Sequence, residues 1–219
     1  MKFTKEAIRN SMLLYAVTDR AWLKENESLI SVCKAVLEQG ATFLQIREKD
    51  LDEDAFSQEA DDLKKLCEVY QVPFVVNDNV EIALQIDADG VHVGQSDIKG
   101  RDIRKMIGAE KILGISAGTV EEAIAAEKAG ADYIGVGAIF GTSTKKNARY
   151  LTIEKLKEIC DAVSIPVVAI GGIAASNLME LEGSGVDGVA VVSAIFAAED
   201  PGKATGELLE LAKRMVHHG

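Results

Sequence analysis

Three polar side chains, Gln45, Arg47 and Lys49, alternate along the end of an otherwise apolar run. Successive side chains of a β-strand point to opposite faces, so these three share one face and Ile46 points to the other. A parallel strand covered by helices is usually apolar on both faces, so two cations and an amide there need a partner. The pattern leaves two interpretations open: an internal salt-bridge network with Glu48 or a nearby aspartate, or an anionic ligand.

Two aspartates, Asp78 and Asp97, follow neighbouring strands that the sequence predicts. Because neighbouring parallel strands end at the same edge of a sheet, the two carboxylates are placed to share one ion. Hard oxygen donors without an accompanying Cys or His suit Mg²⁺, which takes one or two carboxylates and fills its shell with water and phosphate oxygens. Alternatively, Asp78 caps the following helix and Asp97 closes a turn. The pairing on adjacent strands favours the metal site.

Two short loops follow the last two predicted strands, at Gly171-Gly172 and Val192-Ser193. In a barrel of alternating strands and helices, these loops commonly bind a phosphate through backbone N–H groups. A tight turn is the plain alternative for a Gly-Gly pair, but its position favours a phosphate site.

Polar side chains also follow the fifth and sixth predicted strands. The hydroxyls and the lysine of residues 142–145 suit an oxyanion cradle, and a flexible polar loop beside Gly141 is the alternative. Ser116 either orients a leaving group or simply ends its strand. We expect His92, which lies between two valines, to be a hydrogen-bonded structural residue.

These features imply two anion-binding regions. One combines a magnesium site with several cations and suits a diphosphate, whereas the other lacks a metal and suits a monophosphate. The sequence shows no Ser-His-Asp set, no catalytic Cys-His pair and no isolated glutamate base. Chemistry that depends on charge stabilisation fits better: a magnesium-bound diphosphate departs, and a second, phosphorylated substrate captures the electrophile.

Short β-rich apolar runs alternate with amphipathic stretches along the chain. The predicted strands are 13–18, 42–47, 73–77, 90–93, 112–116, 133–137, 166–170 and 188–192. The predicted helices are 28–39, 53–70, 80–86, 98–107, 120–128, 153–162, 177–181 and 203–216. Gly40 and Gly130 stand where a left-handed residue ends a helix. At helix N-termini, Thr119 with Glu122 predicts a capping box and Thr152 predicts an N-cap.

One sequence pattern recurs, as Glu-Gln-Gly-Ala-Thr at 38–42, Lys-Ala-Gly-Ala-Asp at 128–132 and Gly-Ser-Gly-Val-Asp at 183–187. Each copy ends a predicted helix and begins a strand, so βα units repeat. About eight such units predict an α/β fold, a single-domain TIM (β/α)8 barrel over residues 1–219 with a short N-terminal extension over about 1–11. A doubly wound open sheet is the alternative, but residues 18–21 lack its glycine-rich dinucleotide fingerprint.

The composition of the 219 residues, 47% of them hydrophobic, indicates one substantial core. No apolar run approaches the roughly 20 residues that span a bilayer, so no membrane partner is expected. The N-terminus carries no signal-peptide pattern, and we expect a cytoplasmic location. The net charge of −11 argues against nonspecific binding to nucleic acid or anionic membranes, while small anionic ligands stay compatible with it. The sequence does not predict whether the chain forms a homo-oligomer.

Two further groups of residues receive plain structural interpretations. Cys33, Cys67 and Cys160 are odd in number and widely spaced, so we expect buried, reduced thiols on helices. Arg101, Arg104 and Lys105 are expected on a solvated helix face.

Seven motifs, taken in order, resemble those of the thiamine-phosphate synthase (thiamine-phosphate pyrophosphorylase) family. They are Gln45-Ile-Arg-Glu-Lys49, Asn77-Asp78, His92-Val-Gly-Gln-Ser-Asp97, Gly114-Ile-Ser116, Gly137-Ala-Ile-Phe-Gly-Thr-Ser-Thr-Lys145, Ala169-Ile-Gly-Gly-Ile173 and Val192-Ser-Ala-Ile195. The resemblance implies a transferase. Hydroxymethylpyrimidine diphosphate would lose pyrophosphate, and the nitrogen of thiazole phosphate would attack the pyrimidine's methylene carbon to give thiamine phosphate, in a Mg²⁺-assisted dissociative substitution.

The resemblance also implies which residues bind the two small phosphorylated substrates. The pyrimidine diphosphate would contact Gln45, Ile46, Arg47, Glu48, Lys49, Asn77, Ser116 and Lys145. The thiazole phosphate would contact Thr142, Ser143, Thr144, Gly172, Val192 and Ser193. Asp78 and Asp97 would bind Mg²⁺. The residues that act in catalysis would be Ser116, Lys145, Arg47 and Lys49.

One position departs from the family pattern, which usually has proline before its Thr-x-Thr-Lys loop, where Gly141 stands here. Glycine enlarges the set of open conformations, so we expect a more mobile loop and weaker ground-state binding with the chemistry retained. An unchanged or higher KM for thiazole phosphate in a Gly141→Pro variant would contradict this. Rival interpretations are a thiazole tautomerase, a non-catalytic phosphate sensor and a sugar-phosphate isomerase barrel. The retained cations and paired aspartates argue against them.

Overall fold

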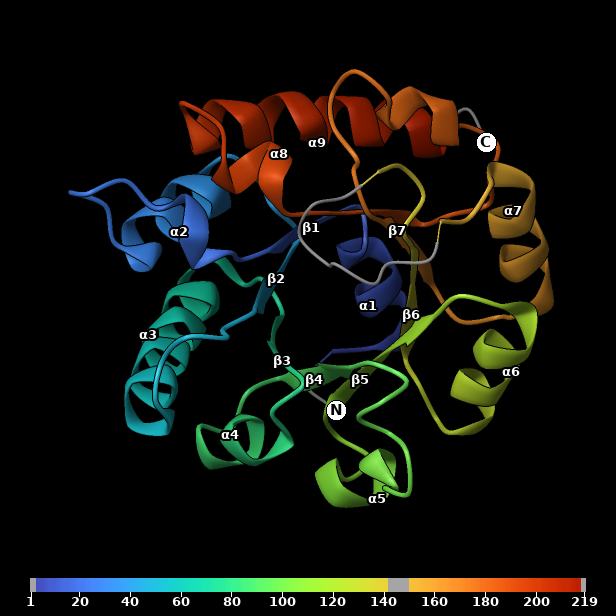
Figure 1. Ribbon diagram of the computed structural model, residues 1–219, viewed down its shortest axis with the longest axis horizontal. Helices are drawn as coiled ribbons and strands as arrows, with labels where there is room; N and C mark the ends of the chain where they lie inside the picture. Colours follow the sequence, from blue (N-terminus) through green and yellow to red (C-terminus); the bar gives the residue numbers. More distant parts are fainter. Residues whose placement is uncertain (1–2, 142–149, 218–219) are drawn as a thin grey trace.

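The computed structural model of the chain describes residues 3–141 and 150–217. These residues form parallel strands that pair in sequence order and close into a barrel (Figure 1). The strands are β1 (Leu14–Val17), β2 (Phe43–Ile46), β3 (Phe74–Asn77), β4 (Gly90–Val93), β5 (Ile112–Ala117), β6 (Tyr133–Gly137), β7 (Val167–Ile170) and β8 (Gly188–Val191). The predicted TIM (β/α)8 barrel is confirmed.

Helices surround the barrel and connect its strands (Figure 1). They are α1 (Lys5–Ser11), α2 (Leu29–Glu38), α3 (Glu53–Tyr70), α4 (Val80–Gln85), α5 (Ile103–Ile107), α6 (Val120–Lys128), α7 (Ile153–Ala162), α8 (Ser193–Phe196) and α9 (Pro201–His217), with 3₁₀ helices η1 (Arg20–Trp22) and η2 (Leu178–Leu181). Within the described part of the chain, no helix combines the length and apolar character needed to cross a membrane.

Several helices differ from their predicted form. The predicted helix 98–107 is confined to α5, because Gly100 adopts a positive φ of 76° and Asp102 caps a new N-terminus through the N–H of Lys105. The stretch 177–181 forms the 3₁₀ helix η2 instead of an α-helix. The short helices η1 and α8 were not predicted, since a single turn leaves no periodic pattern to detect.

The predicted N-terminal extension contains α1, which closes one end of the barrel. Thr4 caps this helix by accepting a hydrogen bond from the N–H of Ala7 at 3.1 Å. Ile8 and Met12 are buried and pack with the side chains of the barrel interior. In Figure 1, α1 lies within the ring of strands. The N-terminal ends of the strands are therefore covered, and the opposite end carries the cavity described below.

Alternation along the strands separates two layers of the core. Tyr15, Phe43 and Tyr133 belong to the cluster inside the barrel, whereas Leu44 and Ile46 belong to the cluster between strands and helices. This period of two is what the sequence of the second strand predicts. The other two residues of β2, Phe43 and Gln45, therefore face the barrel interior.

The predicted helix ends are largely confirmed. Gly40 and Gly130 adopt positive φ values of 93° and 84°, and Thr152 accepts the N–H of Lys155. Thr119 likewise accepts the N–H of Glu122. The capping box there is incomplete, because the Glu122 carboxylate accepts the N–H of Gly118 instead of that of Thr119.

The recurring sequence pattern has a structural explanation at the N-terminal ends of the strands. The residue before each even-numbered strand accepts a hydrogen bond from the N–H of the preceding strand's first residues. The pairs are Thr42 with Leu14 at 2.8 Å, Asp89 with Phe74 at 3.0 Å, Asp132 with Leu113 at 2.8 Å and Asp187 with Val167 at 2.8 Å. Each side chain thus ties two adjacent strands together.

Arg104 corrects a prediction at the same end of the barrel. Instead of lying on a solvated helix face, it donates to the carbonyls of Gly130, Gly108 and Lys111 and pairs with Asp132 at 2.6 Å. A guanidinium presents several donors in one plane, which is why it can serve so many acceptors.

Candidate active site

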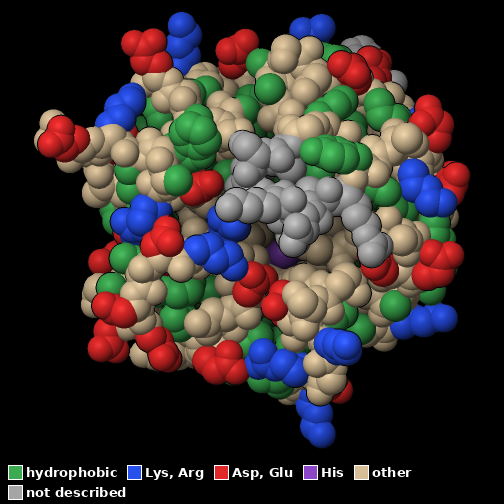
Figure 2. Space-filling view, viewed as in Figure 1, with side chains coloured by type: hydrophobic (Ala, Val, Ile, Leu, Met, Phe, Trp, Pro, Cys, Tyr) green, Lys and Arg blue, Asp and Glu red, His purple; other side chains and the backbone are tan. Residues whose placement is uncertain are grey.

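A cavity of about 670 Å³ opens at the C-terminal ends of the strands. Side chains or backbone from all eight strands line it, so it sits on the axis of the barrel. Figure 2 shows this face hollowed near its centre, with basic and acidic side chains together at the edge of the hollow. Active sites of this fold occupy that end of the barrel.

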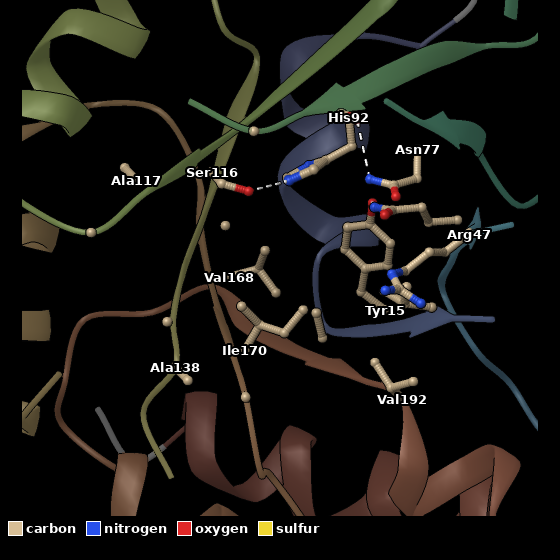
Figure 3. Close-up of a pocket in the computed structure, with 18 of the residues that line it drawn as sticks. Tyr15, Arg47, Asn77, His92, Ser116, Ala117, Ala138, Val168, Ile170 and Val192 are labelled. Carbon is tan, nitrogen blue, oxygen red and sulfur yellow. Dashed lines mark hydrogen bonds between the residues drawn. The ribbon is translucent and has the colours of Figure 1, made fainter. Parts of the chain in front are cut away.

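Most of the residues predicted from sequence lie together in this cavity. Its lining includes Gln45, Arg47, Lys49, Asn77, Asp78, Asp97, Ser116, Gly172, Val192 and Ser193. Residues 142–145 were predicted to contact the two substrates and to form a mobile loop. They lie outside the residues that the structure describes. Figure 3 shows the lining as two sides, with Asn77 and His92 above and Ala138, Ile170 and Val192 below.

The structure does not bring Ile46 and Glu48 to this cavity. The side chain of Ile46 is buried in the outer core. The carboxylate of Glu48 is only 2% exposed and accepts a hydrogen bond from Arg20 Nε at 2.8 Å. Its other oxygen accepts the N–H groups of Lys49 and Asp50. Both side chains thus lie outside this cavity and stabilise the end of β2.

The cations at the end of β2 differ in their partners. Lys49 Nζ lies 2.9 Å from Asp78 Oδ2, so an internal ion pair accounts for this cation. Arg47 lines the cavity without an ion-pair partner among residues 3–141 and 150–217. Glu48, which the sequence offered as an alternative partner, pairs with Arg20. An internal salt bridge therefore explains the charge of Lys49. For Arg47, the interpretation that remains is an anionic ligand.

Asp78 is not the cap of the following helix. Asn79 takes that role by accepting the N–H of Ile82 at 2.9 Å. Asp78 has a positive φ of 62°, a left-handed conformation that aspartate adopts more readily than most residues with a side chain. Its backbone N–H donates to the carbonyl of His92 at 2.8 Å, and its Oδ1 accepts Asn77 Nδ2 at 3.0 Å. The carboxylate is thus fixed at the cavity wall.

Asp97 closes a turn, as one of the two sequence interpretations held. Its Oδ2 accepts the N–H of Gly94 at 2.9 Å. The same side chain lines the cavity that Asp78 lines. No cluster of three or more His, Cys, Asp or Glu ligands occurs among the residues that the structure describes. Any metal held here would accordingly rest on two carboxylates and take its other ligands from elsewhere.

The loop after β7 brings backbone close to the cavity. Gly171 and Gly172 have positive φ values of 104° and 66°. A Cβ on Gly172 would lie 2.2 Å from the carbonyl oxygen of Gly141, so only glycine fits. Ser193 stands at the first position of α8, separated from β8 by Val192 alone, and lines the same cavity. The two loops are therefore neighbours across the cavity mouth.

A buried hydrogen-bond chain crosses the floor of the cavity. Gln45 Nε2 donates to the Tyr15 hydroxyl, and the Tyr15 and Tyr133 hydroxyls lie 2.7 Å apart. Tyr133 Oη lies 3.0 Å from His92 Nδ1, and His92 Nε2 lies 2.9 Å from Ser116 Oγ (Figure 3). Burial raises the pKa of both phenols above the usual value, so both stay protonated.

Sequence reasoning missed the tyrosines, Gln95 and Glu122. Tyr15 and Tyr133 each stand at an inward position of a predicted strand, and a buried phenol needs a partner for its hydroxyl. That signal existed, but besides each other the two tyrosines have partners on two other strands, Gln45 on β2 and His92 on β4. Gln95 donates to the carbonyl of Ser116 at 2.7 Å, and Glu122 accepts the N–H of Gly118 at the cavity wall.

Comparison with known proteins gives one consistent family. A family model described as "Thiamine monophosphate synthase" matches residues 14–195. A thiamine-phosphate synthase of Clostridium tetani is 47% identical over 195 residues, which is 89% of this chain and 93% of that protein. One from Ruminiclostridium cellulolyticum is 48% identical over 198 residues, covering 90% of this chain and 94% of that protein.

Solved structures agree with the sequence comparisons. A thiamine phosphate pyrophosphorylase from Pyrococcus furiosus has a TM-score of 0.87 and 40% identity, and the match covers 95% of this chain and 99% of that chain. A (S)-3-O-geranylgeranylglyceryl phosphate synthase from Thermoplasma acidophilum is alike in fold alone, with a TM-score of 0.69 and 13% identity over 98% of this chain and 100% of that chain.

Proposed function

The chain belongs to the thiamine monophosphate synthase family and is a transferase, and we propose from that premise which substrates it joins. They are 4-amino-5-hydroxymethyl-2-methylpyrimidine diphosphate and 4-methyl-5-(2-phosphooxyethyl)thiazole, and the products are thiamine phosphate and pyrophosphate. One observation carries the proposal. A single cavity gathers cations, the paired aspartates Asp78 and Asp97 and a glycine loop at the C-terminal ends of the strands.

The diphosphate half of the site is built on β2, β3 and β5. Arg47 has no ion-pair partner among the described residues and is the cation best placed to pair with a diphosphate oxygen. Lys49, Asn77 and Ser116 add donors around it. Ile46 and Glu48, assigned to this substrate by resemblance, support the strand end from outside the cavity. Lys145 completes this half in the proposal.

Asp78 and Asp97 fit a magnesium ion by the chemistry of their donors. Both offer hard carboxylate oxygens to the same cavity, and Asp78 already attracts a cation, since Lys49 Nζ lies 2.9 Å from its Oδ2. Two carboxylates leave room for the water and phosphate oxygens that Mg²⁺ prefers. Bound there, the ion would neutralise charge that develops on the departing diphosphate.

The thiazole phosphate half lies at the loops after β7 and β8. Gly172 offers an N–H with no side chain in the way, and Ser193 adds a hydroxyl. Val192 and Ile170 form an apolar wall suited to the thiazole ring (Figure 3). The hydroxyls of residues 142–144 complete this half in the proposal.

The chain's contribution to the reaction is positioning and charge stabilisation. The C–O bond between the pyrimidine methylene and the diphosphate breaks, and its electron pair leaves with the diphosphate. The thiazole nitrogen then supplies the electron pair of the new C–N bond. Arg47 and Lys49 stabilise the charge on the leaving group.

A product assay tests the proposal. Purified protein is incubated with both substrates and Mg²⁺, and thiamine phosphate is followed by chromatography with an EDTA control. Product that disappears with EDTA and returns with added Mg²⁺ is the expected result. Isomerisation of the thiazole phosphate without product would identify a tautomerase, and binding without turnover would identify a sensor. Either of these outcomes would overturn the proposal.

A further inference from the structure

We infer that His92 is a positioning residue that sets which way the Ser116 hydroxyl points. The buried chain from Gln45 through Tyr15 and Tyr133 holds the imidazole with its proton on Nε2. The imidazole then donates to Ser116 Oγ, and the serine proton is directed into the cavity. The inference rests on the proposed function only in naming the diphosphate as the acceptor of that proton.

The direction of each bond follows from the orientation of the Gln45 amide and from the number of protons available. Gln45 donates its amide N–H to Tyr15, so the single Tyr15 proton turns to Tyr133. The single Tyr133 proton then turns to His92 Nδ1, which lies 3.0 Å away. A neutral imidazole that accepts at Nδ1 carries its proton on Nε2.

The last bond fixes the role of Ser116. His92 Nε2 lies 2.9 Å from Ser116 Oγ and donates to it. The serine hydroxyl then has its own proton left for a group in the cavity (Figure 3). A diphosphate offers only acceptor oxygens, so a serine that donates matches it. A chain running the other way would turn the serine proton onto His92 and present an acceptor to an acceptor.

Two glycines leave the space that the Tyr133 and His92 rings occupy. A Cβ on Gly114 would lie 2.2 Å from Tyr133 Cζ and 2.5 Å from His92 Nδ1. A Cβ on Gly135 would lie 3.2 Å from His92 Cε1. The Tyr15 and Tyr133 rings also meet edge to face, with centroids 5.8 Å apart. The Tyr133 hydroxyl and the imidazole therefore meet in a space that admits little rotation.

The first test reads the His92 tautomer directly, in ligand-free wild-type protein. Two-bond ¹H–¹⁵N correlations of ¹⁵N-histidine-labelled protein show which ring nitrogen carries the proton, and a His92→Gln variant assigns the signal. We expect a neutral ring with the proton on Nε2. A proton on Nδ1, or on both nitrogens, would overturn the inference. This readout needs no turnover, so it is separate from any failure of the proposed function.

The second test uses Tyr133→Phe, which removes the hydroxyl that faces Nδ1. Loss of a group that orients a ligand-contacting residue typically costs about ten- to a hundredfold. We expect kcat to fall by about that factor with KM changed by less than about threefold, and the Nε2–H signal to weaken. Tyr70→Phe, which removes a hydroxyl bound to Glu38 on the protein surface, is the matched control.

A double variant separates positioning from a general structural effect. If Tyr133 acts through Ser116, then Tyr133→Phe lowers kcat in the wild-type background but changes it little in a Ser116→Ala background. Additive losses in the two backgrounds would overturn the inference. Should Tyr133→Phe fail to fold, Tyr15→Phe interrupts the same chain one step earlier and is scored by the same ¹⁵N signal and the same double-variant comparison.

Discussion

Asp78, one of the two proposed magnesium ligands, pairs with Lys49 and lines the same cavity as Asp97. Asp78→Asn removes the charge and keeps a side chain that tolerates the positive φ at this position. We expect kcat to fall more than about a hundredfold, since the proposed metal loses one of two protein ligands. Binding of thiazole phosphate, measured by calorimetry, should change by less than about threefold.

Asp87→Asn is the matched control for that change. Asp87 also has a positive φ, of 54°, and also pairs with a lysine, Lys111, but it lies outside the cavity. Its variant should keep wild-type turnover. If Asp78→Asn weakened turnover and thiazole phosphate binding equally, the residue would be structural and the metal proposal would fail.

Glu48 supplies a prediction about pH. Burial alone would raise the pKa of its carboxyl, but hydrogen bonds from Asp50, Arg20 and Lys49 hold that pKa below the usual 4.5. A depressed pKa contributes stability that is present above the unfolded-state value and is lost as the pH falls through the folded-state value. Glu48→Gln should therefore lower the free energy of unfolding by about 2 kcal/mol at pH 7, and by progressively less as the pH falls through the depressed pKa of the folded state.

Urea unfolding at several pH values measures this difference. Glu158→Gln is the control, because Glu158 pairs with Lys155 on the surface, where the loss should stay below about 1 kcal/mol. A Glu48→Gln loss that did not shrink in acid would mean that packing, and not the charge, provides the stability.

Among the secondary-structure elements, the four side chains that tie strands together suggest a stability test at Asp132. This aspartate accepts the N–H of Leu113 and pairs with Arg104, so it joins β5, β6 and α5. Asp132→Ala leaves a strand N–H and a partly buried guanidinium short of an acceptor, which should cost about 2–4 kcal/mol. Asp161→Ala on the surface of α7 should cost less than about 0.5 kcal/mol. Chemical denaturation with an unchanged m-value checks both.

The elements also show how far the sequence predicts the structure. Strand positions follow from apolar runs, and the side-chain period of β2 places Gln45 inside the barrel and Ile46 outside. The single-turn helices η1 and α8 leave no periodic pattern, so the sequence gives no sign of them. The helix α5 starts late because a local cap at Asp102 prevails over the pattern that precedes it.

The partners of site residues were harder to predict than their positions. The order of strands brings Asp78 and Asp97 to one cavity, as the sequence predicts for neighbouring parallel strands. The chain from Tyr15 through Tyr133 to His92 joins strands that are far apart in sequence, and only a closed barrel makes these side chains neighbours. A local sequence pattern contains no information about such contacts, but it does predict the N-caps at Thr119 and Thr152.

At the scale of the whole molecule, closure of the barrel makes each strand depend on two neighbours, so the fold is expected to open cooperatively. Cys33 on α2 reports on this, because it is fully buried and burial raises the pKa of its thiol. As predicted, Cys33 and Cys67 are buried free thiols on helices, whereas Cys160 on α7, which was also expected to be buried, is only partly buried. A thiol reagent reacts with the exposed thiolate, so Cys33 should react only when the structure opens.

Thiol labelling in low concentrations of urea tests whether α2 opens with the barrel or alone. Helix α2 packs against both α3 and α9, so its release disrupts several interfaces at once. We expect the logarithm of the Cys33 labelling rate to rise with urea at the slope of global unfolding, measured by peptide mass spectrometry. Cys160, whose pKa burial raises to about 12, is the internal comparison and should show a smaller slope, because it is already partly exposed. A Cys33 slope near zero would show that α2 detaches locally while the barrel stays closed.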